Sequence, residues 1–196
     1  MEQRTDEQLL EAYRGGEAST LEVLVRRHHD DLLRFLYRLT GSRTLAEDVF
    51  QEAFLQVHLS ASTFDTSRRF KPWLFTIAAN KARDMLRKNA RRWALDLDAP
   101  VRGSEGEVAF VDLMAIQGPS PSQAMDVTER DAKVQQVVSE LPLLMREILL
   151  LAYFQKMSYA QVAEALDIPL GTVKSRLHSA VAAFAKKWEA ANEVDV

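Results

Sequence analysis

Cysteine is absent from this chain of 196 residues, which excludes disulfides, thiolate chemistry and zinc bound by cysteine. No apolar run reaches the roughly 18 residues of a membrane-spanning helix. The first residues mix acids and bases without an apolar stretch, unlike a secretory signal. With seven glycines and six prolines, the chain is neither collagen-like nor of low complexity. These absences favour a globular protein without a membrane span, which we expect in the cytoplasm.

Motifs of common enzymes are also missing. The sequence contains no P-loop, no Rossmann glycine pattern and no nucleophile elbow. His28 and His29 precede Asp30 and Asp31, but adjacent residues of a helix point in different directions and do not readily chelate one metal. A metal-dependent hydrolase or nuclease is therefore disfavoured. We expect no enzymatic activity, no metal site and no cofactor.

The charged residues are unevenly distributed, although the net charge is only −3. Residues 1–93 hold 16 basic and 13 acidic side chains. Residues 94–127 hold one basic and six acidic side chains, and residues 128–196 hold eight basic and nine acidic side chains. Proline and glycine concentrate in the middle segment, where the helical periodicity fails. We therefore predict two domains, 1–93 and 126–196, joined by an extended acidic linker over 94–125.

Helical periodicity predicts three helices in the first domain ahead of its basic stretch. They cover residues 5–13, 20–39 and 45–59. The expected N-caps are Thr5, Ser19 and Thr44. Gly15 and Gly16 should separate the first two helices, and Gly41 should end the second.

The third of these helices carries a polar face beside its apolar stripe. Four residues at the spacing i, i+3, i+4 and i+7 share that face. They are Asp48, Gln51, Glu52 and Leu55. From spacing alone, a solvated helix surface is the favoured interpretation.

A basic helix with interleaved aromatic residues is predicted from Phe70 to Trp93, after a loop over residues 60–69. Between residues 68 and 92, nine lysines and arginines are opposed only by Asp84. Cations neutralise phosphates, and aromatic rings stack on bases of separated strands. The pattern therefore indicates nucleic-acid binding. The alternative is a solvated basic helix whose aromatic side chains belong to the core.

The second domain returns to helices, over residues 126–141 and 142–154, and then shows a helix-turn-helix pattern. Ser158 and Gln161 form a capping box for a short helix, and a turn over residues 167–169 leads into a second helix. The second helix of such a motif enters the DNA major groove. A helical hairpin without DNA contact is the alternative. The whole chain is thus predicted to be all-α, with two helical domains joined by the linker.

Together these segments carry a family resemblance. AEDVFQEAFLQV (46–57) followed by FKPWLFTIAANKARDMLRK (70–88) resembles the first conserved domain of extracytoplasmic-function (ECF) sigma factors of the sigma-70 family. LPLLMREILLLAYFQKMSYAQVAEALDIPLGTVKSRLHSAV (141–181) resembles their second domain. The resemblance covers nearly the whole chain, and both motifs in this order are far more specific than either alone. It implies a bacterial sigma factor that binds core RNA polymerase, directs it to promoters and melts the −10 region.

The resemblance also implies roles for particular residues. The face of Asp48, Gln51, Glu52 and Leu55 would bind the clamp helices of the largest polymerase subunit, which reverses the interpretation from spacing alone. Single-stranded DNA at the −10 element would be opened and held by Phe64, Arg68, Arg69, Lys71, Trp73, Asn80, Lys81, Arg83, Arg87 and Lys88. Duplex DNA at the −35 element would be read by Ser158, Thr172, Lys174, Ser175, Arg176 and His178.

Further partners follow from the same resemblance. The flap region of the polymerase would bind the chain, the acidic linker would thread the RNA-exit path, and an anti-sigma factor is a possible antagonist. The sequence departs from the family at Ala79, where relatives often carry arginine, so one phosphate contact is expected to be missing. A helix-turn-helix regulator that never binds core polymerase is the alternative. It would leave the Asp48 face and the basic helix unexplained.

Overall fold

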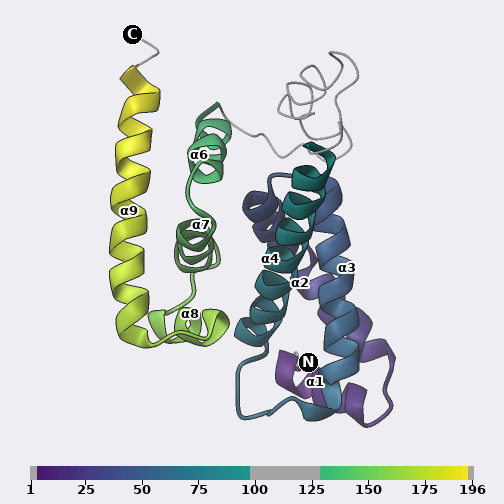
Figure 1. Cartoon of the computed structure of the whole chain (residues 1–196). Helices are drawn as coiled ribbons and strands as arrows, with labels where there is room; N and C mark the ends of the chain where they lie inside the picture. Colours follow the sequence, from purple (N-terminus) through teal and green to yellow (C-terminus); the bar gives the residue numbers. More distant parts are fainter. Residues whose placement is uncertain (1–3, 98–128, 194–196) are drawn as a thin grey trace.

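The computed structural model describes residues 4–97 and 129–193, and all its regular elements are helical (Figure 1). The helices form two groups, an N-terminal unit over residues 4–97 and a C-terminal unit over residues 129–193. The prediction of an all-α fold with two helical domains is confirmed. Residues 98–128 lie outside the described residues, and with them nearly all of the predicted linker.

The N-terminal unit consists of α1 (Asp6–Arg14), α2 (Ser19–Thr40), α3 (Arg43–Ser60) and α4 (Phe70–Leu97). A short 3₁₀ turn, η1 (Ala61–Thr63), follows α3. Helices α2, α3 and α4 pack on one another around fully buried apolar side chains. The largest of these are Leu24, Leu32, Phe35, Leu36, Leu39, Phe70, Leu74 and Phe75.

Two of the three N-caps predicted for this unit are wrong. Thr5 and Gln8 do form a capping box on α1, but α2 begins at Ser19 itself and has no side-chain cap. Helix α3 is capped by Ser42, whose Oγ accepts the backbone N–H of Leu45 at 3.3 Å. Gly41 ends α2 with a φ of 74°, which leaves Ser42 extended and free to cap the next helix two residues earlier than expected.

The C-terminal unit consists of α6 (Glu129–Ser139), α7 (Leu143–Leu149), α8 (Tyr159–Leu166) and α9 (Leu170–Glu193). A single π-helical turn, η2 (Leu150–Phe154), extends α7. The capping box of Ser158 and Gln161 is present on α8. Asp167 then turns the chain into α9 with a left-handed backbone at φ 52°. The helix-turn-helix predicted from the sequence is therefore formed by α8 and α9.

Several predicted helix boundaries differ from the structure, and two of them bear on the predicted linker and recognition segment. Helix α4 continues to Leu97, so the first residues of the predicted linker are helical. Helix α9 begins at Leu170, two residues before the predicted recognition segment. Residues 94–97 contain no proline or glycine, so α4 continues past its predicted end. At the start of α9, the carbonyl of Pro169 accepts the N–H groups of Thr172 and Val173, so the helix begins directly after this proline. Within the described residues, no helix is both long and apolar enough to cross a bilayer.

Candidate nucleic-acid interface

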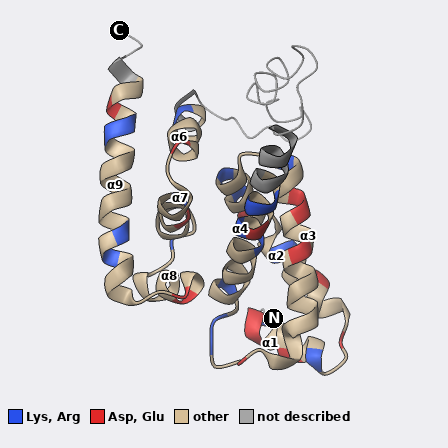
Figure 2. Cartoon of the chain, viewed as in Figure 1, with Lys and Arg blue, Asp and Glu red and all other residues tan. Residues whose placement is uncertain are grey.

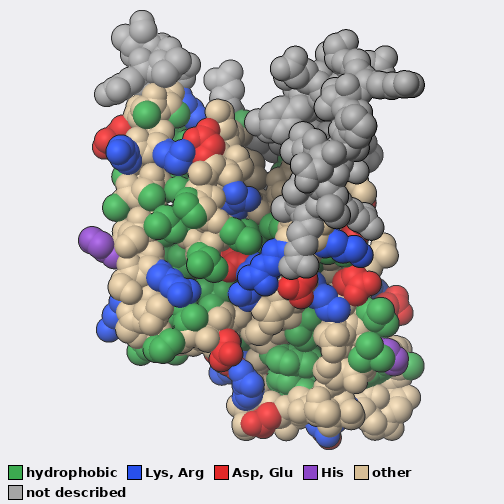
Figure 3. Space-filling view, in the orientation of Figure 1, with side chains coloured by type: hydrophobic (Ala, Val, Ile, Leu, Met, Phe, Trp, Pro, Cys, Tyr) green, Lys and Arg blue, Asp and Glu red, His purple; other side chains and the backbone are tan. Residues whose placement is uncertain are grey.

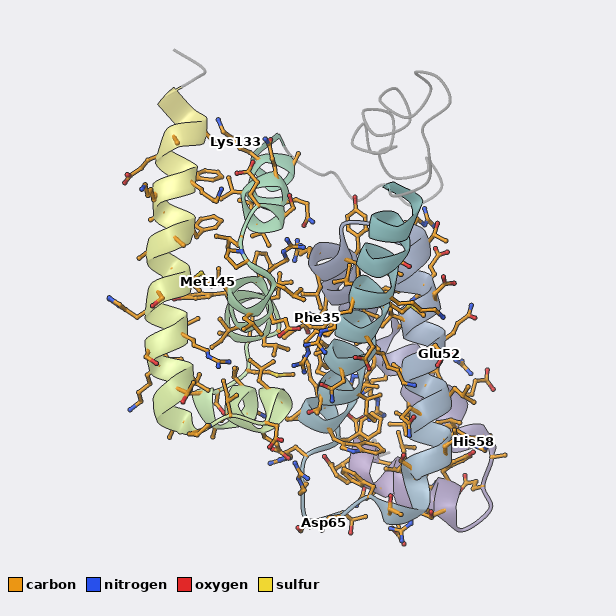
Figure 4. The ribbon with its side chains drawn as sticks, in the orientation of Figure 1. Phe35, Glu52, His58, Asp65, Lys133 and Met145 are labelled. Atoms are coloured by element: carbon orange, nitrogen blue, oxygen red, sulfur yellow. The ribbon has the colours of Figure 1, made fainter. Side chains whose placement is uncertain are left out.

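The polar face of α3 lies beside the basic helix α4. Asp48, Gln51 and Leu55 are exposed, and Leu55 shows 51% of its surface to solvent. Glu52 is half-buried because its carboxylate accepts from Lys81 Nζ of α4 at 3.4 Å. In Figure 4 Glu52 lies on the side of α3 that faces α4, and Figure 2 shows acidic residues of α3 next to basic residues of α4. Acidic and basic surfaces therefore meet along one side of the unit.

Sequence reasoning missed one residue of this face. Leu59, one turn beyond Leu55, is 63% exposed and extends the apolar part of the surface. Its position four residues after Leu55 was the signal that identifies it. An exposed acidic and apolar strip is the kind of surface that a partner protein covers.

Helix α1 fixes the start of α4. The carboxylate of Glu7 accepts the backbone N–H of Phe70 at 3.0 Å and so satisfies a donor at the N-terminus of α4. Burial would raise the pKa of Glu7, but hydrogen bonds from Phe70 and Thr5 outweigh it and lower the pKa. Asp6 in turn contacts the buried His28 of α2 at 2.8 Å and Arg27 at 2.6 Å. The acidic start of α1 thereby holds the first turn of α4 in place.

The loop before α4 is shaped by its own side chains. Asp65 Oδ1 accepts the N–H of Ser67 at 2.9 Å, which lowers the pKa of Asp65. Phe64 is only 6% exposed, with its ring 4.5 Å from that of Trp73 between ring centroids. Trp73 is half-buried and also touches Phe70 at 5.8 Å. Phe64 therefore belongs to an aromatic cluster in this structure, while Trp73 retains an accessible edge. DNA contact by either residue stays a prediction.

Most cations predicted to bind single-stranded DNA have an acidic partner. Arg68 Nε lies 2.7 Å from Glu164 of α8, and Lys71 Nζ lies 3.5 Å from Asp31 of α2. Arg87 pairs with Asp84 within α4 at 3.9 Å. Arg69 and Lys88 are exposed, as is Asn80, whose side-chain oxygen accepts from Arg83. Beside the start of α4, Arg4, Arg27, Arg69 and Lys71 line an open cavity of about 510 Å³ together with Asp6 and Glu7.

Ala79 occupies a packed position on α4. It has no exposed surface in this structure, so its side chain meets neighbouring helices and not solvent. An arginine at this position would have to displace those neighbours before it reached a phosphate. The missing phosphate contact expected from the sequence stays a prediction.

The recognition helix α9 presents an open polar face. Lys174, Ser175 and His178 are exposed, whereas Val173 and Leu177 are buried against the rest of the unit. The residues that flank this face are Thr172 and Arg176, both half-buried. Ser158 is exposed, but its hydroxyl accepts the N–H of Gln161 at 3.3 Å and so caps α8. The structure thus brings the six predicted residues to one helix-turn-helix.

A buried glutamate between the two units was missed by sequence reasoning. Glu147 of α7 is 1% exposed, and Arg83 Nε of α4 lies 3.3 Å from its Oε1. Burial raises the pKa of Glu147 to about 7, against the opposing charges of Arg83, Arg176, Arg87 and Arg146. The signal in the sequence was an Arg-Glu pair inside an otherwise apolar helix. Arg83 and Arg87 of α4 lie too far away in the chain to be found by spacing.

These features define a protein with a basic, aromatic helix in one unit and a helix-turn-helix in the other, which is the organisation of sigma-70 proteins. The family description "Sigma-70 region 2" matches residues 24–92, and "Sigma-70, region 4" matches residues 131–184. The chain belongs to this family, and within it to the ECF group, as the following relatives show.

The ECF RNA polymerase sigma factor SigW of Bacillus subtilis is 33% identical over 172 residues, which cover 88% of this chain and 90% of SigW. The RNA polymerase sigma-H factor of Pseudomonas aeruginosa is 32% identical over 187 residues, 94% of each chain. The chain is thus an ECF-type sigma factor of RNA polymerase, a transcription initiation factor.

Solved structures show the same fold. CnrH, in complex with the cytosolic domain of CnrY, superposes with a TM-score of 0.67 over 94% of this chain and 97% of that chain, at 24% identity. The sigma factor RpoE from Bartonella quintana, in complex with the anti-sigma factor NepR, superposes with a TM-score of 0.65 over 86% of this chain and 96% of that chain, at 21% identity. Both likenesses support the two-unit helical arrangement.

Proposed function

We propose that the predicted N-terminal domain, residues 1–93, binds core polymerase and opens the −10 element, and that the predicted C-terminal domain, residues 126–196, reads the −35 element. The observation that carries this proposal is the juxtaposition of an exposed acidic and apolar face on α3 with the basic helix α4 in one unit. A DNA-binding module needs the basic helix but has no use for the acidic face. A polymerase-binding protein that also opens DNA needs both.

The clamp helices of the largest polymerase subunit are the proposed partner of α3. Asp48 and Gln51 supply exposed polar groups, and Leu55 supplies an apolar centre that is 51% exposed. Apolar centres surrounded by polar groups are common in protein interfaces. Glu52 contributes its charge while it holds Lys81 toward α3.

Helix α4 and the loop before it are the proposed site of strand opening. Exposed Arg69, Asn80 and Lys88 and the paired cations Arg68, Lys71, Lys81, Arg83 and Arg87 would follow the backbone of the non-template strand. Trp73 would stack on an unpaired base beside Phe64. Glu7 supports this site from α1 through its hydrogen bond to Phe70.

Helix α9 is the proposed reader of the −35 duplex. Lys174, Ser175 and His178 face solvent and are placed to reach base edges and phosphates in the major groove. Thr172 and Arg176 flank them, and Ser158 at the start of α8 would contact the DNA backbone. Exposed Leu144 and Val181, 50% and 39% accessible, offer apolar surface for the flap region.

Catalysis of RNA synthesis would remain with the polymerase, so we propose no enzymatic role for this chain. It would act in the cytoplasm, where bacterial polymerase and DNA meet. Residues 94–125 would thread the RNA-exit path as an acidic linker. An anti-sigma factor is a further proposed partner, by analogy with the Bartonella RpoE–NepR complex.

Binding to purified bacterial core RNA polymerase, without DNA, tests this proposal. We expect stoichiometric, submicromolar binding by the full chain and loss of binding in Asp48→Arg. Glu47→Arg is the matched control, because Glu47 is also exposed on α3 but pairs with Arg43 of the same helix at 2.9 Å. Circular dichroism would confirm that both variants keep their helicity. Unchanged core affinity in Asp48→Arg would remove the α3 face from the proposal.

A chain that fails to bind core polymerase but binds a specific duplex would instead be a helix-turn-helix regulator. That outcome would leave the acidic face of α3 without a function. It would not alter the fold described here.

A further inference from the structure

The start of α4 borders an open cavity of about 510 Å³, here called the basic cavity. Its charged lining consists of Arg4, Arg27, Arg69, Lys71, Asp6 and Glu7. The cations come from the segment before α1, from α2, from the loop before α4 and from α4 itself. Figure 3 shows basic side chains exposed on that loop. Folding therefore gathers charges that lie far apart in the sequence around one cavity.

Both carboxylates of the basic cavity already have partners. Asp6 contacts Arg27 at 2.6 Å and the buried His28 at 2.8 Å. Burial would raise the pKa of Asp6, but hydrogen bonds from His28 and Arg27 outweigh it and lower the pKa. Glu7 accepts the backbone N–H of Phe70 at 3.0 Å. Four cations against two carboxylates leave an excess of two positive charges in the lining.

Two of the cations have donors to spare. Arg69 is exposed, and its side chain makes no hydrogen bond or ion pair with another described residue. Arg27 uses Nη1 for Asp6 and for the carbonyl of Arg4, at 2.6 and 3.1 Å. A guanidinium has five N–H donors, so those on Nε and Nη2 of Arg27 are left for another acceptor.

The other two cations have exposed partners outside the lining. Lys71 Nζ lies 3.5 Å from Asp31 of α2. Arg4 pairs with Glu17 at 2.8 Å, and these two side chains are 54% and 50% exposed. Exposed ion pairs contribute little free energy, so an anion with several charges can displace these carboxylates.

The lining also restricts the chemical class of the ligand. Among the described residues that line the cavity, Pro72 is the only apolar one and none is aromatic, so a nucleic-acid base has no ring to stack on. Arginine forks and lysines match the oxygens of phosphate. The volume lies in the range of small-molecule sites and exceeds what one phosphate group needs. These features favour a chain of phosphates.

We propose that the basic cavity binds the polyphosphate group of a free small molecule, either inorganic polyphosphate or a nucleoside triphosphate. Arg27 and Arg69 would donate to the phosphate oxygens, and Arg4 and Lys71 would contact them from the segment before α1 and from α4. Binding itself does not depend on the proposed function. Its consequence rests on that function, because Arg69 and Lys71 are proposed to hold single-stranded DNA, and bound polyphosphate would compete with the −10 strand.

Isothermal titration calorimetry of the full chain with inorganic tripolyphosphate tests the site, at about 0.1 M salt and without added metal. We expect saturable binding of one ligand per chain in the micromolar range. Inorganic phosphate should bind at least about tenfold more weakly, because it carries fewer charges and acceptors. ATP distinguishes the two sources: equal affinity would show that the phosphate chain alone is recognised, and tighter binding of ATP would make a nucleotide the ligand.

Variants of the exposed cations locate the site. Arg69→Ala and Arg4→Ala should each weaken tripolyphosphate binding by about fivefold, and the double variant by more than about tenfold. Both side chains are exposed, so these variants should keep their helicity by circular dichroism. Arg26→Ala is the matched control, because Arg26 is an exposed arginine of α2 that pairs with Glu22 outside the cavity. Its affinity should equal that of the unchanged chain.

The results separate this inference from the proposed function. Absence of saturable tripolyphosphate binding would overturn the inference and leave core binding untouched. Equal weakening by Arg26→Ala and Arg69→Ala would also overturn it, because the attraction would then be general and not local. Binding of a single-stranded oligonucleotide without binding of tripolyphosphate would assign these cations to DNA alone. Failure to bind core polymerase, with tripolyphosphate binding that depends on Arg69, would overturn the proposed function and not the cavity.

Discussion

The two helices predicted to meet DNA differ in what surrounds their polar residues. On α9, Lys174, Ser175 and His178 face solvent. On α4 and the loop before it, Arg68, Lys71 and Arg83 face carboxylates from other helices. If α9 reads duplex DNA as proposed, it can do so without rearrangement, whereas α4, the proposed strand-opening helix, must first lose its acidic partners. The comparison teaches that the number of basic residues in a sequence shows how many phosphates a helix could contact. Whether those residues are already paired with carboxylates in the structure decides when they can do so.

The largest effect is expected for Trp73→Ala in α4, the proposed strand-opening helix. The substitution removes the stacking ring and its contact with Phe64 at 4.5 Å between centroids. Strand opening should fall at least tenfold, corresponding to about 1.4 kcal/mol or more of lost base stacking. The stability of the N-terminal unit should fall by about 2 kcal/mol, because Trp73 is only half-buried. Permanganate reactivity of promoter thymines in the holoenzyme measures the opening.

Trp73→Phe is the control for this prediction. It keeps an aromatic ring and most of the packing, so opening should recover largely. Core binding should be equal in both variants. Normal opening in Trp73→Ala would remove this residue from the strand-opening site and would weaken the contrast between α4 and α9.

The second prediction concerns the pH dependence of the closed state, in which the two units pack together as they do in this structure. Burial raises the pKa of Glu147 from an ordinary value of 4.5 to about 7, against the four arginines that oppose the rise. Opening admits water, which removes the larger effect, that of burial on the pKa. It also takes away Arg83 and Arg87, whose charges oppose the rise, but burial is the dominant cause, so the pKa should fall toward its ordinary value. Protonation therefore favours the closed state. Its stability should be greatest below about 4.5 and be lost progressively as the pH rises through about 7.

Energy transfer between a donor and an acceptor dye on the double variant Ser62→Cys with Ser179→Cys measures this titration, because the chain has no cysteine of its own and the two exposed positions lie in different units. Glu147→Gln mimics the protonated carboxyl, so it should stay closed at a pH where the unchanged chain opens, and its transfer should vary little with pH. Glu140→Gln, which changes an exposed glutamate of the same unit, should titrate like the unchanged chain. A pH-dependent opening that persists in Glu147→Gln would assign the titration to another group.

The contrast between the helices also shows what the sequence can predict. The fold class, the helix-turn-helix and the start of α4 at Phe70 follow from local periodicity and capping, and all three agree with the structure. The acidic partners do not follow from local patterns. Arg68 and Glu164 are 96 positions apart, and only tertiary packing brings them together. The burial of Glu147 was hidden for the same reason.

The two incorrect caps have a local cause. At the start of α3, Gly41 with its φ of 74° places Ser42, and not Thr44, in the extended conformation that a cap requires. At the start of α2, Ala18 already has a helical backbone, so Ser19 lies inside the helix and does not cap it. Sequence alone offered several hydroxyl residues within three positions and no means to choose among them. The acidic linker cannot be compared in this way, because residues 98–128 lie outside the described part of the chain.

A smaller effect is expected from Glu7, which supports α4 from α1. Glu7→Gln replaces the carboxylate that accepts the N–H of Phe70 at 3.0 Å with a neutral amide. The substitution should lower the free energy of unfolding of the N-terminal unit by about 1 kcal/mol. Since hydrogen bonds lower the pKa of Glu7 in the folded chain, its contribution is present above about 4.5 and is lost as the pH falls through the folded pKa. Urea unfolding at several pH values measures both effects.

Glu11→Gln is the matched control, because Glu11 forms only an exposed pair with Arg14 of the same helix at 2.9 Å. Its substitution should change the stability by less than about 0.5 kcal/mol. Equal destabilisation by the two variants would show that Glu7 acts through general charge on α1 and not through the start of α4.

The smallest effect is expected on the open recognition helix. Lys174→Ala should weaken upstream promoter binding by the holoenzyme and reduce the slope of log K against log salt by about 1, because one phosphate contact is lost. Arg176→Ala should do the same and also remove a charge near Glu147, which raises the pKa of Glu147 further and moves opening to higher pH. Arg26→Ala, on an exposed arginine of α2 paired with Glu22 at 2.7 Å, should change neither quantity. If Lys174→Ala and Arg176→Ala both shifted the opening pH, α9 would be coupled to the interface between the two units as closely as α4, and the contrast between an open and a paired helix would fail.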